Sequence, residues 1–240
     1  MKASNFDHWD LFNQCTNVNL TASVKEQLNN YYQLLIQENE KYNLTRIVDE
    51  TDFYYKHVLD SLLFTNEFSL DQQKIADLGS GAGFPGIVLK IFFPQLSMVL
   101  IESNQKKVNF LRLVINTLGL QDIEVVDTRA EEYSLLHQEE FEVVVCRAVA
   151  YLDIILELGV QMLKVQGTYI LLKGPRAEEE IIRSGNLPRE LSLRLVNKQV
   201  LIDKYLGTRI NLFYQKVDKT PQRYPRKYSV IKKSSGGFES

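Results

Sequence analysis

The amino-acid sequence predicts an α/β protein whose mostly parallel sheet ends in an antiparallel hairpin. From residue 74 onward, short apolar segments alternate with amphipathic helical patterns, which is typical of a parallel sheet with crossover helices. Five such strand–helix steps precede two strands with little sequence between them, so these last two strands are expected to pair as a hairpin. Only helical patterns precede this region.

The first 70 residues are expected to form a helical extension. Apolar residues recur at helical spacing over Val24–Ile36, and Thr21 or Ser23 is placed to cap that helix. After the turn-forming segment Asn43–Thr45, a second helix is expected over Asp52–Phe64. We therefore divide the chain into a helical extension over 1–70, a main domain over 71–218 and a basic C-terminal tail over 219–240.

Seven segments of the main domain are expected to be strands. They are Lys74–Leu78, Met98–Ile101, Ile123–Val126, Glu142–Cys146, Thr168–Leu172, Arg194–Ile202 and Ile210–Gln215. An amphipathic helix is expected over Val108–Leu118, with Asn104 placed to cap it and Gly119 to end it. Another helix is expected over Leu152–Leu163, closed near Gly167.

Composition and charge describe an ordinary globular protein with a basic end. Apolar residues make up 45% of the chain, charged residues 24%, and the net charge is −2. Six of the 28 basic residues and no acidic residue lie in the segment 219–233, which fits an anionic partner at one edge. The prolines and the Ser-Ser-Gly-Gly run after Val217 predict an extended arm.

The cysteines and the N-terminal residues indicate the cellular compartment in which the protein is expected. Cys15 and Cys146 are far apart and lack the spacing of a disulfide framework or zinc site, which favours a reducing cytosol and no metal. The first residues lack an apolar signal segment, and no apolar run approaches the ~18 residues of a membrane span. We therefore expect a cytoplasmic protein without a membrane segment.

The segment KIADLGSGAGFPG, residues 74–86, is the strongest functional signal in the chain. It reads as an apolar strand that ends at Asp77 and runs into a glycine-rich loop before a helix, where the backbone can approach a ligand closely. Its glycines are Gly79, Gly81, Gly83 and Gly86. The last three match the dinucleotide fingerprint GxGxxG, which on its own is weak. An acid beside the loop suits a cationic ligand better, and S-adenosylmethionine carries a sulfonium and an ammonium group but no phosphate.

Two further strand ends complete the predicted cofactor site. Glu102 ends the next strand, where its carboxylate can accept hydrogen bonds from both ribose hydroxyls, although NAD enzymes use an acid there too. The third strand leads to Ala130 and Glu131, whose backbone is expected beside the adenine pocket; solvated acids at strand ends are the alternative. Asp77, Gly79, Gly81 and Gly83 supply the loop side of this site, and the pattern favours a methyltransferase.

Beyond the loop, short motifs along the chain resemble the bacterial ribosomal RNA methyltransferase G family, also known as glucose-inhibited division protein B. The segment DLGSGAGFPG at 77–86 has an unusual Phe-Pro-Gly ending, and the resemblance covers about residues 40–228. The other matching motifs, in family order, are Asn43-Leu44-Thr45, His57-Val58-Leu59-Asp60-Ser61-Leu62, Ile101-Glu102-Ser103 with Lys106-Lys107 and Phe110-Leu111, Arg129-Ala130-Glu131, Arg147-Ala148-Val149-Ala150, Leu172-Lys173-Gly174 and Tyr224-Pro225-Arg226-Lys227.

The resemblance implies a Rossmann-like class I S-adenosylmethionine-dependent methyltransferase that methylates N7 of a guanine in the decoding-region hairpin of 16S rRNA. By matching position it also implies cofactor contacts, namely Gly79, Phe84, Ala130, Glu131 and Arg147. The chain departs from the family at Cys146, where serine is usual, and after Lys227. For Arg147, a structural salt bridge is the alternative to a cofactor or phosphate contact.

The predicted chemistry needs no catalytic base, and we name no catalytic residue. The strand end at Cys146-Arg147-Ala148 lacks the Asn/Asp-Pro-Pro-aromatic turn of enzymes that methylate base amines, and Cys146 lacks an adjacent activator in sequence. Guanine N7 carries a lone pair and no proton, so alignment with the methyl donor supplies most of the rate.

Candidate substrate contacts are more scattered. His57, Asp60 and Ser61 share one predicted helix at the rim of the site, with a core or capping role as the alternative. Lys173 follows the fifth strand and is expected to contact phosphate. Arg226 and Lys227, interleaved with aromatic residues, have the composition of single-strand RNA contacts, although a solvated tail explains their charges almost as well.

We therefore expect a monomeric enzyme acting on 16S rRNA or the 30S particle. Three rival functions stay open at this point: a small-molecule methyltransferase of the same fold, an NAD(P) oxidoreductase, and a non-catalytic RNA-binding assembly factor that keeps the cofactor pocket.

Overall fold

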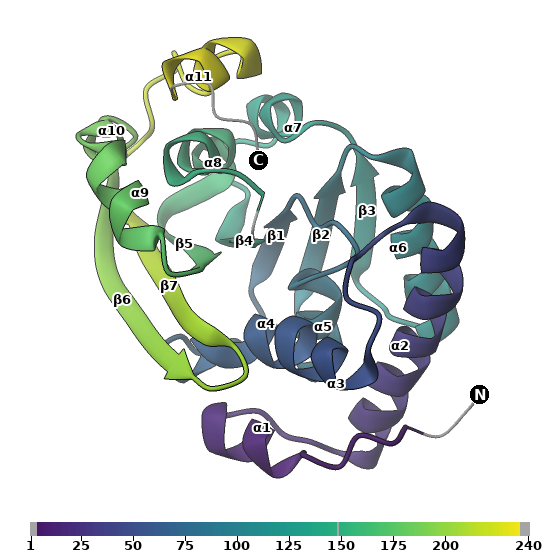
Figure 1. The fold of residues 1–240 in the computed structure, drawn as a ribbon. Coiled ribbons are helices and arrows are strands. Elements are labelled where there is room, and N and C mark those ends of the chain that lie inside the picture. Colours follow the sequence, from purple (N-terminus) through teal and green to yellow (C-terminus); the bar gives the residue numbers. More distant parts are fainter. Residues whose placement is uncertain (1–3, 148, 236–240) are drawn as a thin grey trace.

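A seven-stranded sheet forms the centre of the molecule (Figure 1). The computed structural model describes residues 4–147 and 149–235. The strand order is β3-β2-β1-β4-β5-β7-β6, and only the pairs β5–β7 and β6–β7 are antiparallel. The strands are β1 (Lys74–Leu78), β2 (Ser97–Glu102), β3 (Ile123–Asp127), β4 (Phe141–Arg147), β5 (Leu163–Lys173), β6 (Leu193–Asp203) and β7 (Gly207–Lys216). This arrangement confirms the predicted mostly parallel sheet with a terminal antiparallel hairpin.

Helices cover both faces of the sheet. The N-terminal helices pack on one face together with α5 and α6, and α7 to α11 lie on the other (Figure 1). The N-terminal helical elements are α1 (Asp10–Cys15), α2 (Ala22–Tyr42), α3 (Glu50–Asp52), a π-helical stretch (Phe53–Leu59), α4 (Asp60–Leu62) and a 3-10 turn (Leu63–Asn66). The others are α5 (Gly86–Phe92), α6 (Gln105–Leu118), α7 (Ala130–Leu136), α8 (Leu152–Gly159) with a 3-10 turn (Val160–Met162), α9 (Ala177–Ser184), α10 (Leu187–Glu190) and α11 (Tyr228–Ser234).

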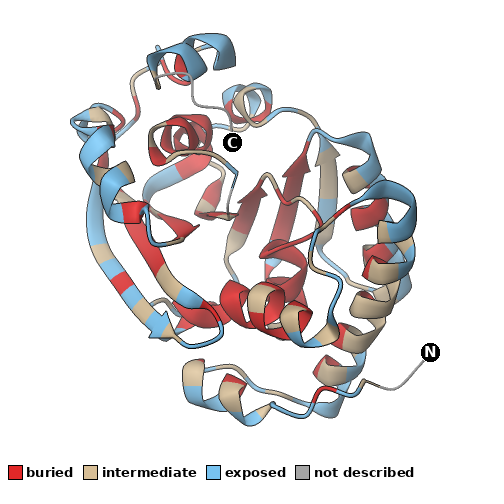
Figure 2. Ribbon diagram, viewed as in Figure 1, coloured by how far each residue is buried: buried red, intermediate tan, exposed pale blue. Residues whose placement is uncertain are grey.

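Side chains on the two faces of the central strands pack into two separate hydrophobic cores. Ile75 of β1 joins the core under the N-terminal helices, whereas its neighbours Ala76 and Leu78 join the core under α8. Figure 2 shows the central strands buried and much of the edge strand β6 exposed. Because the helical extension shares the first core with the sheet, the boundary at residue 70 stays a prediction.

Several local predictions are confirmed and three are corrected. The Asn104 side chain accepts hydrogen bonds from the amides of the first turn of α6, and Gly119 ends that helix in the left-handed region at φ 64°. The helix expected over 52–64 is longer, spanning 50–66, and is interrupted by the π-helical stretch. Gly167 does not close a helix. It lies inside β5, where an added Cβ would approach a Glu142 carbonyl oxygen at 2.9 Å.

The arm expected to be extended is partly helical. Residues 228–234 form α11, because Ile231 turns inward and is 1% exposed against the core under α8. The Gly-Gly part of the predicted arm lies outside the described residues. Within residues 4–147 and 149–235, no helix has both the length and the apolar character that membrane crossing requires.

Candidate active site

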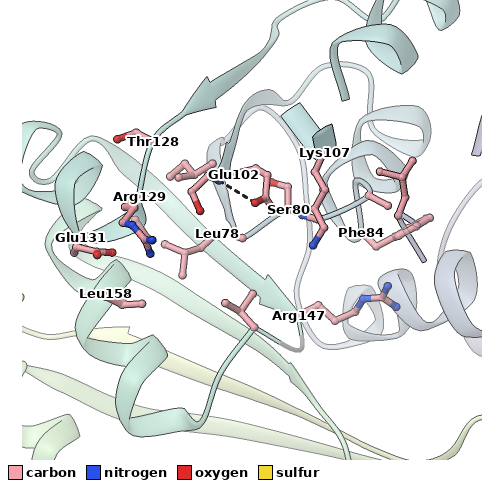
Figure 3. Close-up of a pocket in the computed structure, with 18 of the residues that line it drawn as sticks. Leu78, Ser80, Phe84, Glu102, Lys107, Thr128, Arg129, Glu131, Arg147 and Leu158 are labelled. Carbon is pink, nitrogen blue, oxygen red and sulfur yellow. Dashed lines mark hydrogen bonds between the residues drawn. The ribbon is translucent and has the colours of Figure 1, made fainter. Parts of the chain in front are cut away.

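A cavity of about 430 Å³ opens at the carboxyl ends of the parallel strands. It lies beside the point where the strand order reverses, between β1 and β4, the usual ligand position in such sheets. Figure 3 shows Glu102 near its middle, Arg129, Glu131 and Leu158 towards one end, and Lys107, Phe84 and Arg147 towards the other. The lining residues are Leu44, Thr45, His57, Leu78–Ala82, Phe84, Ile101–Ser103, Lys107, Thr128–Glu131, Arg147, Val149, Leu158 and Tyr228.

The glycine loop forms one wall of the cavity. The amides of Gly79 and Ser80 donate hydrogen bonds to the Ile101 carbonyl at 2.9 and 3.1 Å, which ties the loop to the end of β2. Gly79 has φ 69° and Gly81 has φ 60°, conformations that side chains disfavour. A Cβ on Gly79 would lie 2.5 Å from a Val149 methyl, whereas a Cβ on Gly81 would meet nothing closer than 3.9 Å. The loop therefore leaves open space at Gly81.

Asp77 lies beneath this loop and is absent from the cavity wall. Its side chain is 0% exposed, and Oδ2 accepts a hydrogen bond of 2.9 Å from the Gly86 amide at the start of α5. Oδ1 has no hydrogen-bond partner in the described structure. Burial raises the pKa of Asp77 from 3.8 to about 7, against the lowering effect of the Gly86 and Ser80 hydrogen bonds. Asp77 holds the loop to the helix, and its contact with a cofactor stays a prediction.

The Asp77→Asn variant is expected to change how stability depends on pH. Because the folded pKa is raised, the folded chain binds a proton that the unfolded chain releases, so this contribution is lost as pH rises from 4 through 7. The unfolding free energy of the wild type, relative to that of Asp77→Asn, is expected to fall by about 2–4 kcal/mol between pH 5 and 8. Urea unfolding of both proteins across this range measures it, and a difference that is constant with pH would contradict the assignment.

Glu102 points into the cavity from the end of β2. Its Oε2 accepts from the Gly81 amide at 2.9 Å, and its Oε1 accepts from the Ser103 and Asn104 amides at 2.9 and 2.8 Å. Three amides therefore fix the carboxylate, and Oε2, which accepts only one of them, has acceptor capacity left. Farther along, Ala130 and Glu131 begin α7 and line the cavity, so the predicted adenine residues do share a wall with Glu102.

Arg147, at the end of β4, is the centre of a polar cluster at the other end of the cavity. Its guanidinium donates to the Lys56 carbonyl at 2.8 Å, to Asp60 Oδ2 at 3.1 Å and to His57 Nδ1 at 2.9 Å. Asp60 also pairs with Arg209 of β7 at 2.7 Å. Arg147 therefore forms the salt bridge that was the alternative to a cofactor or phosphate contact, and it also lines the cavity.

His57 is held as a neutral ring. Since arginine only donates, Nδ1 must accept from Arg147, so Nε2 carries the proton and lies 3.1 Å from Thr45 Oγ1. Burial, with help from the Arg147 charge, lowers the pKa of His57 to about 3. The ring stacks on Phe84 at 4.1 Å between centroids, with the planes 8° apart. His57 sits in the π-helical stretch, a feature often found at functional sites.

The remaining predicted substrate residues do not line the cavity. Ser61 is fully buried and donates to the His57 carbonyl at 2.6 Å, and Asp60 bridges two arginines. Lys173 is buried between the Ala150 carbonyl and Glu180, at 2.7 and 2.8 Å.

Two more predicted residues lie on the C-terminal segment. Arg226 binds the fully buried Glu157 of α8 through its backbone amide and its guanidinium, whereas Lys227 is exposed where α11 begins. Neither residue lines the cavity. Gly83 does not line it either, and a Cβ added to Gly83 would overlap the Tyr31 side chain.

Sequence reasoning missed several residues that line the cavity. Thr45 and Lys107 belong to motifs that were noted without a site role, and Arg129 precedes the predicted adenine contacts. Tyr228 reaches the cavity from α11, far away in sequence. Only the basic-aromatic pattern around Tyr228 hinted at this, because its approach depends on how α11 packs.

The cavity fits S-adenosylmethionine. The open space at Gly81 admits a ligand against the loop backbone, and Glu102 offers a fixed acceptor for a ribose diol. Among known structures, a SAM-dependent methyltransferase from Aquifex aeolicus has the same fold, with a TM-score of 0.53 and 17% identity over 76% of this chain and 98% of that chain. The fold is that of the Rossmann-like S-adenosylmethionine-dependent methyltransferases.

The family follows from sequence comparison. The model of the rRNA small subunit methyltransferase G family matches residues 24–202. The chain is 54% identical to ribosomal RNA small subunit methyltransferase G of Mesoplasma florum over 231 residues, covering 96% of this chain and 98% of that protein. It is 39% identical to the protein of that name from a Thermoanaerobacter strain, over 87% and 89% of the two chains. The chain belongs to the rRNA small subunit methyltransferase G family, so it is an rRNA methyltransferase that uses S-adenosylmethionine.

Proposed function

We propose that the chain methylates N7 of a guanine in the decoding-region hairpin of 16S rRNA. Family membership supports the rRNA as substrate. The choice of atom rests on one observation: in the described part of the cavity, the imidazole and carboxylate groups that could remove a proton from a base are already engaged or lie at the end away from His57 and Arg147. An acceptor that loses no proton before methyl transfer suits such a site.

Each candidate base has a reason not to act as one. The only basic nitrogen of neutral His57 accepts the Arg147 hydrogen bond, and Glu102 accepts three backbone amides. Glu131 lies towards the other end of the cavity, at the proposed adenine site (Figure 3). Cys146 is 3% exposed in the core under α8, where burial raises the pKa of its thiol, so it does not supply a nucleophile.

The charges at this end of the cavity suit the product as well. Methylation at N7 places positive charge on the guanine ring, which an unpaired cation beside it would oppose. The Arg147 charge is paired with Asp60 and His57 is neutral, and we assign the charge of Lys107, which lines the same end, to an RNA phosphate. The stacked pair of His57 and Phe84 forms a buried wall, and positioning against such a wall is what an alignment-driven reaction needs.

We assign cofactor binding to the loop and the strand ends. The bound cofactor supplies an electrophilic methyl group. Gly79, Gly81 and Phe84 form the wall near that group, Glu102 binds the ribose hydroxyls, and Ala130 and Glu131 bind the adenine edge. Asp77 and Gly83 shape the loop from beneath, and Arg147 orients His57 and Phe84.

For the substrate, we keep His57 and Lys227 as proposed contacts. The contacts of Asp60, Ser61, Lys173 and Arg226 favour positioning roles instead. We propose a monomer that acts in the cytoplasm on 16S rRNA or on the 30S particle, without a metal ion.

A hairpin RNA with 7-deazaguanosine at the target position tests the choice of atom. This analogue replaces N7 with a carbon and leaves the Watson–Crick edge intact, so we expect binding with no methyl transfer. The unmodified hairpin is expected to accept methyl groups at a rate that varies little between pH 8 and 9, above the pKa of about 7 of Asp77, since the transfer step needs no group with a pKa in that range. Methyl transfer to the 7-deaza hairpin would place the acceptor on another atom.

A further inference from the structure

A second cavity, about 480 Å³ in volume, adjoins the cofactor cavity. It lies between the end of α2 and the start of α6, and the two cavities share Leu44, Ser103 and Lys107. We call it the α2–α6 groove. Its lining residues are Tyr42, Asn43, Leu44, Ser103, Asn104, Gln105, Lys106 and Lys107. The three shared residues place this groove directly beside the cofactor cavity.

The α2–α6 groove is basic and has an aromatic wall. No acidic residue lines it, and both Lys106 and Lys107 do. Within residues 4–147 and 149–235 neither ammonium group has an ion-pair or hydrogen-bond partner, and that of Lys106 lies 5.9 Å from the centroid of the Tyr42 ring. The Tyr42 side chain is 40% exposed at the end of α2. Nearby Glu38 is already paired with Lys41 at 2.6 Å.

We propose that the α2–α6 groove binds the RNA strand next to the target guanine, with Lys106 and Lys107 on its phosphates and Tyr42 stacked on a flanking base. Unpaired lysines beside an exposed aromatic ring are the chemistry that recognises single-stranded RNA. The shared wall sets the location, because a guanine in the first cavity leaves its neighbours at the mouth of the second. This inference rests on the proposed rRNA substrate.

Charge reversal at Lys106 tests the inference, with Lys204 as the matched control. Lys204 also lies over an exposed tyrosine, 4.7 Å from the centroid of the Tyr205 ring, but it lies at the β6–β7 turn and lines neither cavity. Lys106→Glu is expected to weaken binding of the 16S hairpin about tenfold at low salt and to lower the slope of log affinity against log salt by about one. Lys204→Glu is expected to bind as the wild type does.

The readouts separate this inference from the proposed function. Hairpin binding is measured by fluorescence anisotropy without cofactor, and the KM values for RNA and for S-adenosylmethionine are measured in the transfer assay. A rise in the KM for RNA alone supports the groove. Equal RNA binding by the two variants overturns it even if the wild type methylates, whereas a wild type that binds but never methylates refutes the proposed function alone. A loss seen with 30S particles but not with hairpin RNA assigns the groove to a ribosomal protein and overturns the proposal.

Discussion

Gly81→Arg is expected to abolish S-adenosylmethionine binding and to lower kcat/KM for methyl transfer by about 100-fold or more, with the fold retained. The glycine loop gives the reason. A Cβ on Gly81 meets no atom closer than 3.9 Å, so the new side chain is accommodated by extending into the cavity that the cofactor needs. Titration calorimetry with S-adenosylmethionine measures the loss, and circular dichroism checks the fold.

Gly119→Arg is the control for backbone strain. Gly119 has φ 64°, close to the 60° of Gly81, and an added Cβ there also meets open space, so both variants carry a similar cost of about 1–2 kcal/mol for a left-handed side-chain residue. Gly119 ends α6 and does not line the cavity. Wild-type cofactor affinity in Gly81→Arg, or an equal loss in Gly119→Arg, would contradict the location of the cofactor.

Arg226→Ala is expected to destabilise the protein by roughly 2–4 kcal/mol, because it leaves a buried carboxylate unpaired. Glu157 is 0% exposed, and the guanidinium of Arg226 binds it with contacts of 2.7 to 3.2 Å. Loss of this pair also frees the segment that brings Tyr228 to the cavity, so the KM for S-adenosylmethionine is expected to rise. Adding Glu157→Gln should recover part of the stability.

Arg223→Ala is the matched control in the same segment. Arg223 pairs with Glu190 at 3.7 Å, with both side chains more than half exposed, so its loss is expected to cost no more than about 0.5 kcal/mol. If Arg226→Ala is as stable as Arg223→Ala but binds RNA less tightly, the RNA role inferred from sequence is right and the structural role is wrong.

The fold could be predicted because it depends on local patterns. Neighbouring residues alone indicate the alternating strands, the cap at Asn104 and the left-handed glycine at 119. Each of these features agrees with the structure. The errors arose where tertiary packing decides the outcome. Gly167 looks like a helix stop but lies in a long strand, and α11 forms because Ile231 finds a core far away in sequence.

The candidate site could be predicted only in part, for the same reason. Glycine loops and acidic residues at strand ends can be recognised in the sequence, and Glu102 does line the cavity. The roles of charged residues depend on partners that sequence does not reveal. Arg226 was expected on RNA, yet it binds Glu157, 69 residues away. Arg147 draws His57 and Asp60 from the N-terminal extension, which no pattern in either segment indicates.

The most direct measurement maps the methylated atom. Unmethylated 16S rRNA, naked and in the 30S particle, is incubated with the enzyme and S-adenosylmethionine and then treated with borohydride and aniline, which cleave the strand at N7-methylguanosine. Primer extension locates the break. We predict a single cleavage in the decoding-region hairpin that is absent with Gly81→Arg. No enzyme-dependent cleavage in either substrate, or methyl transfer to another atom, would contradict the account.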